Sequence, residues 1–214
     1  MFITFEGIEG CGKSTQLLRL ADYLRSRGGE VFSTREPGGC PIADQIRAVL
    51  LDADNAQMVP SAELLLYAAA RAQHVSEMIV PALTRGAIVL CDRFSDATRA
   101  YQSFGRGLAR TLIEQLNEIA CGETTPQLTV LIDCPVPVGL GRAKARIEAS
   151  SGPREERFEL EAFSFHERVR NGYLTLAAES PDRFVVIDGD ADQDTVYQRL
   201  LDAVLPRLSG SVYR

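Results

Sequence analysis

The sequence predicts an α/β fold in which a parallel sheet of five strands is flanked by helices. Five short apolar runs recur along the 214-residue chain, without the alternation typical of a strand that has one face in water. Segments with apolar residues at helical spacing separate these runs. A glycine-rich turn joins the first run to the first helical segment. This alternation of strands and helices is typical of a parallel sheet with right-handed crossovers.

Each element follows from its own pattern. The apolar runs predict strands at residues 2–5, 31–34, 87–91, 128–132 and 184–187. Helical spacing predicts helices at residues 14–27, 42–51, 62–84, 109–120, 137–147, 161–179 and 195–208. Pro81 lies inside the third helix and predicts a kink there, because proline has no N–H to donate. A chain of this length forms one domain or, alternatively, two small ones, and the lack of a long linker favours one domain over residues 1–214.

The glycine-rich turn matches the phosphate-binding motif G-x-x-x-x-G-K-[ST] without a gap. In such a loop the backbone N–H groups face the phosphates, and the dipole of the following helix favours negative charge. The motif predicts that Lys13 reaches the β- and γ-phosphates of a nucleotide and that the Ser14 hydroxyl ligates Mg²⁺. The residues predicted to hold the nucleotide here are Gly7, Ile8, Glu9, Gly10, Cys11, Gly12, Lys13, Ser14 and Thr15.

The amino-acid composition argues against a nucleic-acid-binding surface, a disulfide framework, a metal cluster and a membrane span. A net charge of −6 at pH 7 argues against a nucleic-acid surface, which needs a basic stripe. The five cysteines are scattered without a C-x-x-C pair, which indicates reduced thiols rather than a disulfide framework or a zinc site. The two histidines, His74 and His166, are too few for a metal cluster, and their helical patterns favour surface or packing roles. No signal peptide or membrane-spanning apolar run is visible, so we expect a soluble, cytoplasmic protein.

Ionisable residues follow every predicted strand at its carboxyl end, where ligands bind in open α/β sheets. They are Glu6, Arg35, Asp92 with Arg93, Asp133 and Asp188. For any single residue, a polar loop that begins where the strand ends explains the pattern as well as function does. We assign Asp92 and Arg93 to function, because they directly follow an unbroken apolar run.

Further motifs appear in a fixed order. They are TREPGG at 34–39, ELLLYAAARAQ at 63–73, DRF at 92–94, AYQ at 100–102, RFE at 157–159 and FHERVRNGYL at 165–174. With the phosphate loop, they make the chain resemble the bacterial thymidylate kinases over nearly its whole length. The resemblance implies a P-loop NTPase fold and transfer of the γ-phosphoryl group of ATP to dTMP, giving dTDP and ADP for dTTP synthesis. It also implies Mg²⁺ as cofactor and a homodimer, with neither nucleic acid nor membrane as partner.

The resemblance implies a binding site for the base and sugar of dTMP. Tyr67 and Arg71 lie one helical turn apart, so a ring can stack on thymine while a guanidinium contacts the base. Thr98 and Gln102 are implied near the polar edge of thymine. Tyr101 is implied near the sugar, where it would crowd a ribose 2′-hydroxyl. The family usually has phenylalanine at Tyr67, and serine or asparagine at Thr98.

The resemblance also assigns the charged groups. Arg93 is implied as the grip on the dTMP phosphate, which a planar guanidinium suits well, with Arg35 and Arg47 as further candidates. Asp92 would hold Mg²⁺ through water. Glu9 would serve near the acceptor or the metal, and Glu36 has a similar claim, but either residue could instead be a structural cap. The catalytic set is Lys13, Arg93, Arg157 and Glu9; the metal set is Ser14 and Asp92.

A short arginine-bearing lid is expected at about residues 146–157. Phosphoryl transfer needs a cation near the migrating group, and the loop position where some relatives carry that arginine is Gly10 here. Arg146, Arg154 and Arg157 lie in or beside a soft segment, which suits a closing lid. Arg146 and Arg154 are assigned to ATP, and Arg157 best matches the family pattern, although Glu156 replaces the usual aspartate.

Two other classes of function stay open. The first is a kinase that acts on a different nucleotide or on a nucleoside; a free nucleoside would not need the Arg93 phosphate contact. The second is a nucleotide-dependent switch without turnover. The guanine-reading N-K-x-D motif does not occur in the sequence, which argues against a GTPase switch.

Overall fold

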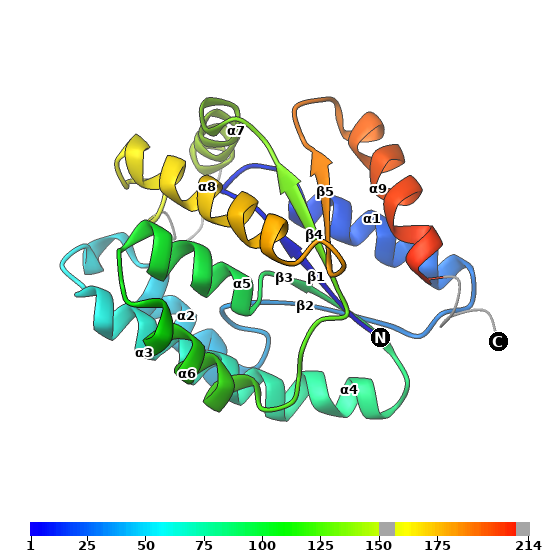
Figure 1. Cartoon of the computed structure of the whole chain (residues 1–214), viewed down its shortest axis with the longest axis horizontal. Coiled ribbons are helices and arrows are strands. Elements are labelled where there is room, and N and C mark those ends of the chain that lie inside the picture. The colour runs from blue at the N-terminus through cyan, green and yellow to red at the C-terminus, as the bar shows by residue number, and fades with distance from the viewer. Residues whose placement is uncertain (150–156, 209–214) are drawn as a thin grey trace.

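The sheet has five parallel strands in the order β2-β3-β1-β4-β5, in a computed structural model that describes residues 1–149 and 157–208 (Figure 1). The strands are β1 Phe2–Glu6, β2 Val31–Arg35, β3 Ile88–Asp92, β4 Leu128–Asp133 and β5 Phe184–Asp188. All five predicted strands are confirmed. Each ends one residue later than predicted, so the ionisable residue noted after each run is the last residue of the strand.

The register brings these strand ends together. Arg35 pairs with Asp92 across β2 and β3, and Asp133 pairs with Asp188 across β4 and β5. The central strand β1 is buried along its whole length, between β3 and β4. Residues that follow β1 therefore emerge in the middle of the carboxyl edge of the sheet, which is where an open α/β sheet binds its ligand.

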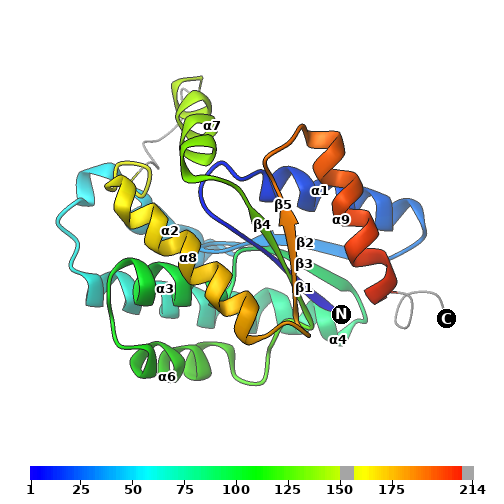
Figure 2. The same cartoon turned by 45° about the horizontal axis from the view of Figure 1, so that its top comes forward.

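Helices cover both faces of the sheet, and the views agree that α1 and α9 lie together on one of them (Figure 1, Figure 2). On the other face α8 packs on β4 and β5, and α3 lies between α2 and α6. The bounds are α1 Lys13–Ser26, α2 Pro41–Leu51, α3 Pro60–His74, α4 Val80–Thr84, α5 Ser95–Thr98, α6 Arg110–Cys121, α7 Val136–Glu148, α8 Phe163–Glu179 and α9 Gln193–Leu208. A 3₁₀ turn at Ala53–Asn55 follows α2.

The long helical pattern around Pro81 is not one regular helix. α3 ends at His74, and a π-helical stretch, Val75–Ile79, leads into α4. Pro81 is the second residue of α4 and donates no hydrogen bond to the preceding turn. A π-bulge is one way in which a helix adapts to such a defect. The irregularity expected at Pro81 thus lies in the turn before it.

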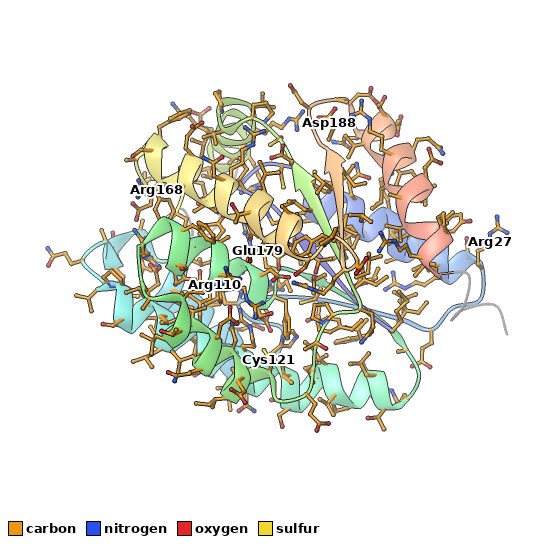
Figure 3. All side chains as sticks on the ribbon, in the orientation of Figure 1. Arg27, Arg110, Cys121, Arg168, Glu179 and Asp188 are labelled. Carbon is orange, nitrogen blue, oxygen red and sulfur yellow. The ribbon has the colours of Figure 1, made fainter. Side chains whose placement is uncertain are left out.

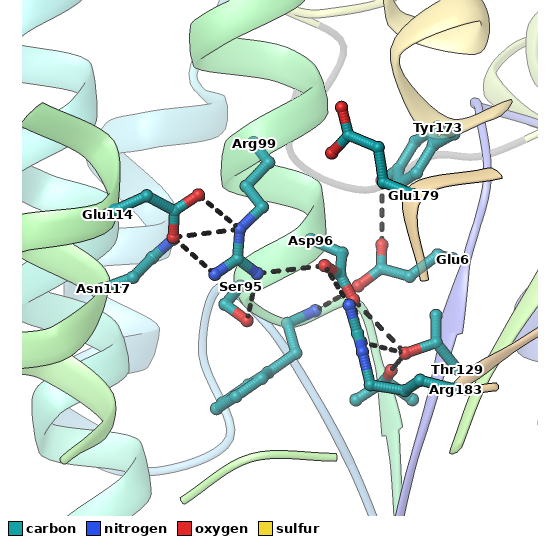
Figure 4. Close-up of polar contacts among 12 residues, drawn as sticks. Glu6, Ser95, Asp96, Arg99, Glu114, Asn117, Thr129, Tyr173, Glu179 and Arg183 are labelled. Carbon is teal, nitrogen blue, oxygen red and sulfur yellow. Dashed lines mark hydrogen bonds and ion pairs between the residues drawn. The ribbon is translucent and has the colours of Figure 1, made fainter. Parts of the chain in front are cut away.

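A second π-helical stretch, Arg99–Gly105, continues α5, and the sequence did not predict this helix. The start of this stretch is held by Asp96 on α5, which is fully buried and paired with Arg99 and Arg183 (Figure 4). A similar charge pair joins the two neighbouring helices, where Arg110 at the start of α6 donates two hydrogen bonds to Glu179 at the end of α8 (Figure 3). These contacts anchor the segment that carries several predicted site residues.

The five cysteines are all buried and unbonded: Cys11, Cys40, Cys91, Cys121 and Cys134. Burial raises the pKa of Cys121 to about 11 and that of Cys134 to about 12. In the part of the chain that the structure describes, no helix is long and apolar enough to cross a membrane.

Candidate active site

The phosphate loop runs from the end of β1 to Lys13, the first residue of α1. Gly7, Gly10 and Gly12 have φ values of 141°, 68° and 96°, a region that side chains disfavour. The loop also lies close to its neighbours: a Cβ on Gly10 would lie 1.9 Å from the carbonyl oxygen of Gly139 on α7. Backbone conformation and close packing therefore both require glycine at Gly10.

A cavity of about 720 Å³ opens at the carboxyl edge of the sheet. The phosphate loop forms one end, and α3 with the stretch after α5 forms the other. The predicted residues that line it are Glu9, Gly10, Lys13, Ser14, Arg35, Glu36, Arg47, Tyr67, Arg71, Asp92, Arg93, Thr98, Tyr101, Gln102 and Arg146. Most of the predicted site residues, which come from five separate segments of the sequence, thus line one cavity.

Ser14 and Asp92 meet at the loop end of this cavity. The Ser14 hydroxyl donates a hydrogen bond to the Asp92 carboxylate, although 78 residues separate them in sequence. A hydroxyl and a carboxylate are oxygen ligands of the kind Mg²⁺ accepts, and Mg²⁺ commonly takes few protein ligands beside substrate phosphates and water. The pair fits that ion. Within the described residues, no group of three or more His, Cys, Asp or Glu side chains forms a metal cluster.

Arg93 lines the same cavity. One of its guanidinium nitrogens lies 3.2 Å from Glu9 Oε1, and its carbon lies 4.8 Å from the centre of the Tyr101 ring. The Tyr101 hydroxyl donates to the same Glu9 oxygen. On the other side of Glu9, His166 Nδ1 lies 3.2 Å from Oε2. Glu9 is therefore surrounded by an arginine, a phenol and an imidazole.

These contacts set the charge of Glu9. Burial opposes ionisation of its carboxyl group, but His166, Arg93 and Lys13 outweigh burial and lower the pKa of Glu9 to about 2. Burial also raises the pKa of the Tyr101 phenol, which keeps its proton on the oxygen as a donor. At neutral pH the site thus holds a fixed carboxylate beside a fixed guanidinium.

Arg71 is held from three directions and is almost fully buried. It donates to Glu36 Oε2 at 2.7 Å, to Asn117 Oδ1 at 2.9 Å and to the Phe94 carbonyl at 3.1 Å. The other Glu36 oxygen lies 3.0 Å from His74 Nδ1. Because Arg71 has five N–H donors, this cage fixes its plane and leaves donors for a ligand. Tyr67 lines the same cavity one turn earlier, as the spacing predicted.

Comparison with known proteins assigns this architecture to a family. A model of the family described as thymidylate kinase matches residues 5–200. The chain belongs to the thymidylate kinase family. A thymidylate kinase of Trichlorobacter lovleyi is 66% identical over 99% of this chain and 100% of that protein. One from Geobacter sulfurreducens is 61% identical over 97% of each chain. The crystal structure of thymidylate kinase from Ehrlichia chaffeensis matches with a TM-score of 0.76 at 33% identity, over 95% of this chain and 98% of that one.

The resemblance to thymidylate kinases and the P-loop NTPase fold are thereby confirmed. Five residues of the phosphate loop lie behind the cavity wall and do not line the cavity: Gly7, Ile8, Cys11, Gly12 and Thr15. The glycines among them shape the loop. Ile8 offers its carbonyl, which accepts a hydrogen bond from Lys13 Nζ at 3.3 Å.

In this thymidylate kinase fold, Thr98 and Gln102 take different environments. The Thr98 hydroxyl oxygen is buried at the cavity wall without a hydrogen-bond partner among the described residues. Gln102 donates its amide to Glu63 at 2.8 Å. The spacing argument assumed an α-helix, whereas Gln102 lies in a π-helical stretch, where hydrogen bonds run from i to i+5. Both residues nevertheless reach the cavity.

Arg157 does not line the cavity, so its expected place at the transferred phosphate is not what the structure shows. The side chain is buried and donates to Glu63 at 2.7 Å and to the Leu50 carbonyl. Glu63 is fully buried and also pairs with Arg106, so two guanidinium groups surround one buried carboxylate. Arg146 is exposed and lies 3.3 Å from Glu159, which lines the cavity beside it. Arg154 lies outside the described residues, as does most of the predicted lid.

The remaining predicted cations lie at the rim. Arg35 pairs with Asp44 at 3.0 Å, and Arg47 donates to the Pro37 carbonyl at 3.1 Å.

The sequence missed the polar role of both histidines. His74 and His166 are fully buried, so the surface alternative is wrong, and both contact a site carboxylate. The available signal was the place of His166 inside the motif at 165–174 and of His74 directly after the motif at 63–73.

Proposed function

We propose that this member of the thymidylate kinase family transfers the γ-phosphoryl group of ATP to dTMP and releases dTDP and ADP. The observation that carries the proposal is that one cavity joins the phosphate loop to Tyr67 and Arg71 on α3. A polyphosphate suits the loop end, and a pyrimidine suits a ring beside a guanidinium. Relatives that are 61–66% identical are named thymidylate kinase, which supports the same activity here.

At the donor end, Lys13 and the loop N–H groups hold the ATP phosphates. The Lys13 ammonium now rests on the Ile8 carbonyl, and a phosphate oxygen replaces that weak contact when ATP binds. Ser14, and Asp92 through water, would hold Mg²⁺, and the ion would supply charge neutralisation for the phosphates. Because Asp92 ends β3, it is held at a fixed distance from the loop by the sheet.

At the acceptor end, Tyr67 stacks on thymine and Arg71 donates to a base carbonyl. Glu36 works through Arg71 rather than on the nucleotide, since both its oxygens already have protein partners. The unpartnered Thr98 hydroxyl provides a hydrogen bond to the base edge. The Tyr101 ring lies against Arg93, where it fills the space that a ribose 2′-hydroxyl would need.

The acceptor phosphate binds at Arg93, with Arg35 and Arg47 at the rim of the cavity. Transfer through a loose transition state depends on positioning and on neutralised charge. Glu9 keeps the Arg93 guanidinium in place by the 3.2 Å contact. Among the described residues of the lid, Arg146 lines the cavity, whereas Arg157 acts on phosphate only after it leaves Glu63.

The test is ADP release from Mg-ATP with each nucleoside monophosphate in turn, and with thymidine as the matched acceptor without a phosphate. dTMP should give the highest kcat/KM. A preference for thymidine would favour a nucleoside kinase and overturn the phosphate-binding role of Arg93. A preference for another monophosphate would overturn the base assignment. ADP release that no acceptor stimulates would favour a nucleotide switch.

We further propose a homodimer, as the resemblance implies, with α2, α3 and α6 as the interface. These helices pack side by side and carry exposed apolar side chains. These exposed apolar side chains are Ile42, Val49, Leu65, Leu112 and Ile119, of which Ile119 is 78% exposed.

A cytoplasmic location agrees with the buried free thiols.

Sedimentation of an Ile119→Glu variant tests the dimer, because a charge at the centre of an apolar interface is costly. Leu18→Glu on α1 is the matched control, since Leu18 is also exposed but lies outside the proposed interface. The first variant should sediment as a monomer and the second as a dimer. Equal behaviour of the two variants would contradict the interface.

A further inference from the structure

Glu6 is a fully buried carboxyl group that the proposed chemistry does not use. It ends β1, directly before the phosphate loop, and it does not line the cavity. Its two oxygens have separate partners: Oε1 accepts the Phe94 N–H at 2.7 Å, and Oε2 accepts the Tyr173 hydroxyl at 2.8 Å (Figure 4). Phe94 directly follows Arg93 in the chain, and the Tyr173 hydroxyl also bonds to the Arg93 guanidinium.

The first partner fixes the backbone of Arg93. Arg93 is the single non-glycine residue with positive φ (70°) among the described residues, a conformation that a side chain disfavours. Its own N–H donates to the Phe5 carbonyl at 2.9 Å, and the next N–H, that of Phe94, donates to Glu6. The two N–H groups that flank this turn are thus both bound by consecutive residues of β1. Without the Glu6 acceptor, the Phe94 N–H would be a buried donor without a partner.

The second partner fixes the side chain of Arg93. The Tyr173 hydroxyl donates to Glu6 and accepts a hydrogen bond from an Arg93 guanidinium nitrogen at 3.1 Å. Tyr173 is almost fully buried on α8, and its ring meets the Tyr101 ring edge-on at 6.2 Å. The guanidinium is therefore held by Tyr173 on one side and by Glu9 on the other, with its remaining donors left for a ligand.

We propose that Glu6 and Tyr173 are positioning residues that hold the backbone turn and the guanidinium of Arg93 in the direction of the acceptor phosphate. The inference rests on the proposed role of Arg93 as the grip on that phosphate. Glu6 contacts Arg93 through Phe94 and Tyr173 and forms no direct hydrogen bond with the guanidinium. Neither residue touches the nucleotide.

The experiment measures dissociation constants of dTMP and of thymidine by calorimetry for the wild type and for Tyr173→Phe. Loss of one hydrogen bond to a charged group should weaken dTMP binding about ten-fold. Thymidine binding should be unchanged, because thymidine has no phosphate. Tyr197→Phe is the matched control, since Tyr197 is a partly buried tyrosine whose hydroxyl donates to the backbone carbonyl of Arg19, and neither residue lines the cavity.

Three results would overturn the inference: wild-type dTMP affinity in Tyr173→Phe, an equal loss for dTMP and thymidine, or an undiminished effect when Arg93 is already alanine. Glu6→Gln provides a second probe, because its amide cannot accept from both Phe94 and Tyr173. It should also weaken dTMP selectively. Arg93→Ala alone tests the underlying proposal: if this variant binds dTMP normally, the role of Arg93 fails irrespective of Tyr173.

Discussion

Replacing Glu9 by glutamine should remove a pH-dependent part of the stability of the fold. The structure lowers the pKa of Glu9 from its ordinary value of 4.5 to about 2. One pKa unit corresponds to about 1.4 kcal/mol, so the ionised form contributes about 3 kcal/mol at neutral pH. Because the folded pKa lies below the unfolded one, this stability is present above about pH 5 and is lost as the pH falls towards 2.

The assay is urea unfolding of the wild type and of Glu9→Gln at pH 7, 5 and 3.5. The free energy difference between the two proteins should be constant from pH 7 to pH 5. By pH 3.5 it should shrink by about 1 kcal/mol, since the unfolded carboxyl has then bound most of a proton and the folded one has not. Titration of the groups that do not interact with Glu9 cancels in this difference.

Glu123→Gln is the matched control, because Glu123 is an exposed carboxylate in the loop after α6. Its stability should run parallel to that of the wild type at every pH. If the Glu9→Gln profile is also parallel, the contacts with His166, Arg93 and Lys13 do not favour the carboxylate, and the electrostatic account of the site is wrong.

Three further variants test separate parts of the site. Lys13→Ala should abolish turnover while its melting temperature stays close to that of Lys144→Ala, the only other lysine; a near-normal kcat would remove Lys13 from the mechanism. Gly139→Ala places a Cβ 2.5 Å from the Glu9 carbonyl oxygen. Urea unfolding should therefore show a loss of about 1–3 kcal/mol in the free energy of unfolding, and kinetics should show a higher KM for ATP. Wild-type values would contradict the close packing of α7 on the loop. Tyr101→Ala should raise the relative kcat/KM for the ribonucleotide of 5-methyluracil, and an unchanged ratio would show that the ring does not exclude the 2′-hydroxyl.

The sheet and the phosphate loop could be predicted because both depend on local sequence. A strand buried on both faces needs a mostly apolar run, which β1, β3 and β4 have. β2 is only half-buried and contains Ser33 and Thr34, but its short run between helical segments still indicated a strand. The loop motif combines glycines that permit positive φ with Lys13 and Ser14 at fixed spacing. The pair Tyr67 and Arg71 was also within reach, since α3 is a regular helix where they occur.

The parts that escaped prediction depend on contacts between distant residues. Nothing near Arg157 shows that Glu63, 94 residues earlier, is buried and binds its guanidinium. Likewise, His166 reaches Glu9 only because α8 packs on the face of the sheet and brings its first turn beside the phosphate loop. The π-helical stretch at Arg99–Gly105 was missed because a turn widened by packing carries no periodicity of its own.

Because every cysteine is buried, the rate at which each thiol is alkylated measures how often the region around it opens. A maleimide or iodoacetamide can reach a thiol only while the surrounding region is open, so alkylation rates measured by mass spectrometry report local opening. Cys11 lies within the phosphate loop and Cys121 ends α6, so two regions report independently. ATP should slow the modification of Cys11 more than that of Cys121, and no engineered label is needed to observe it.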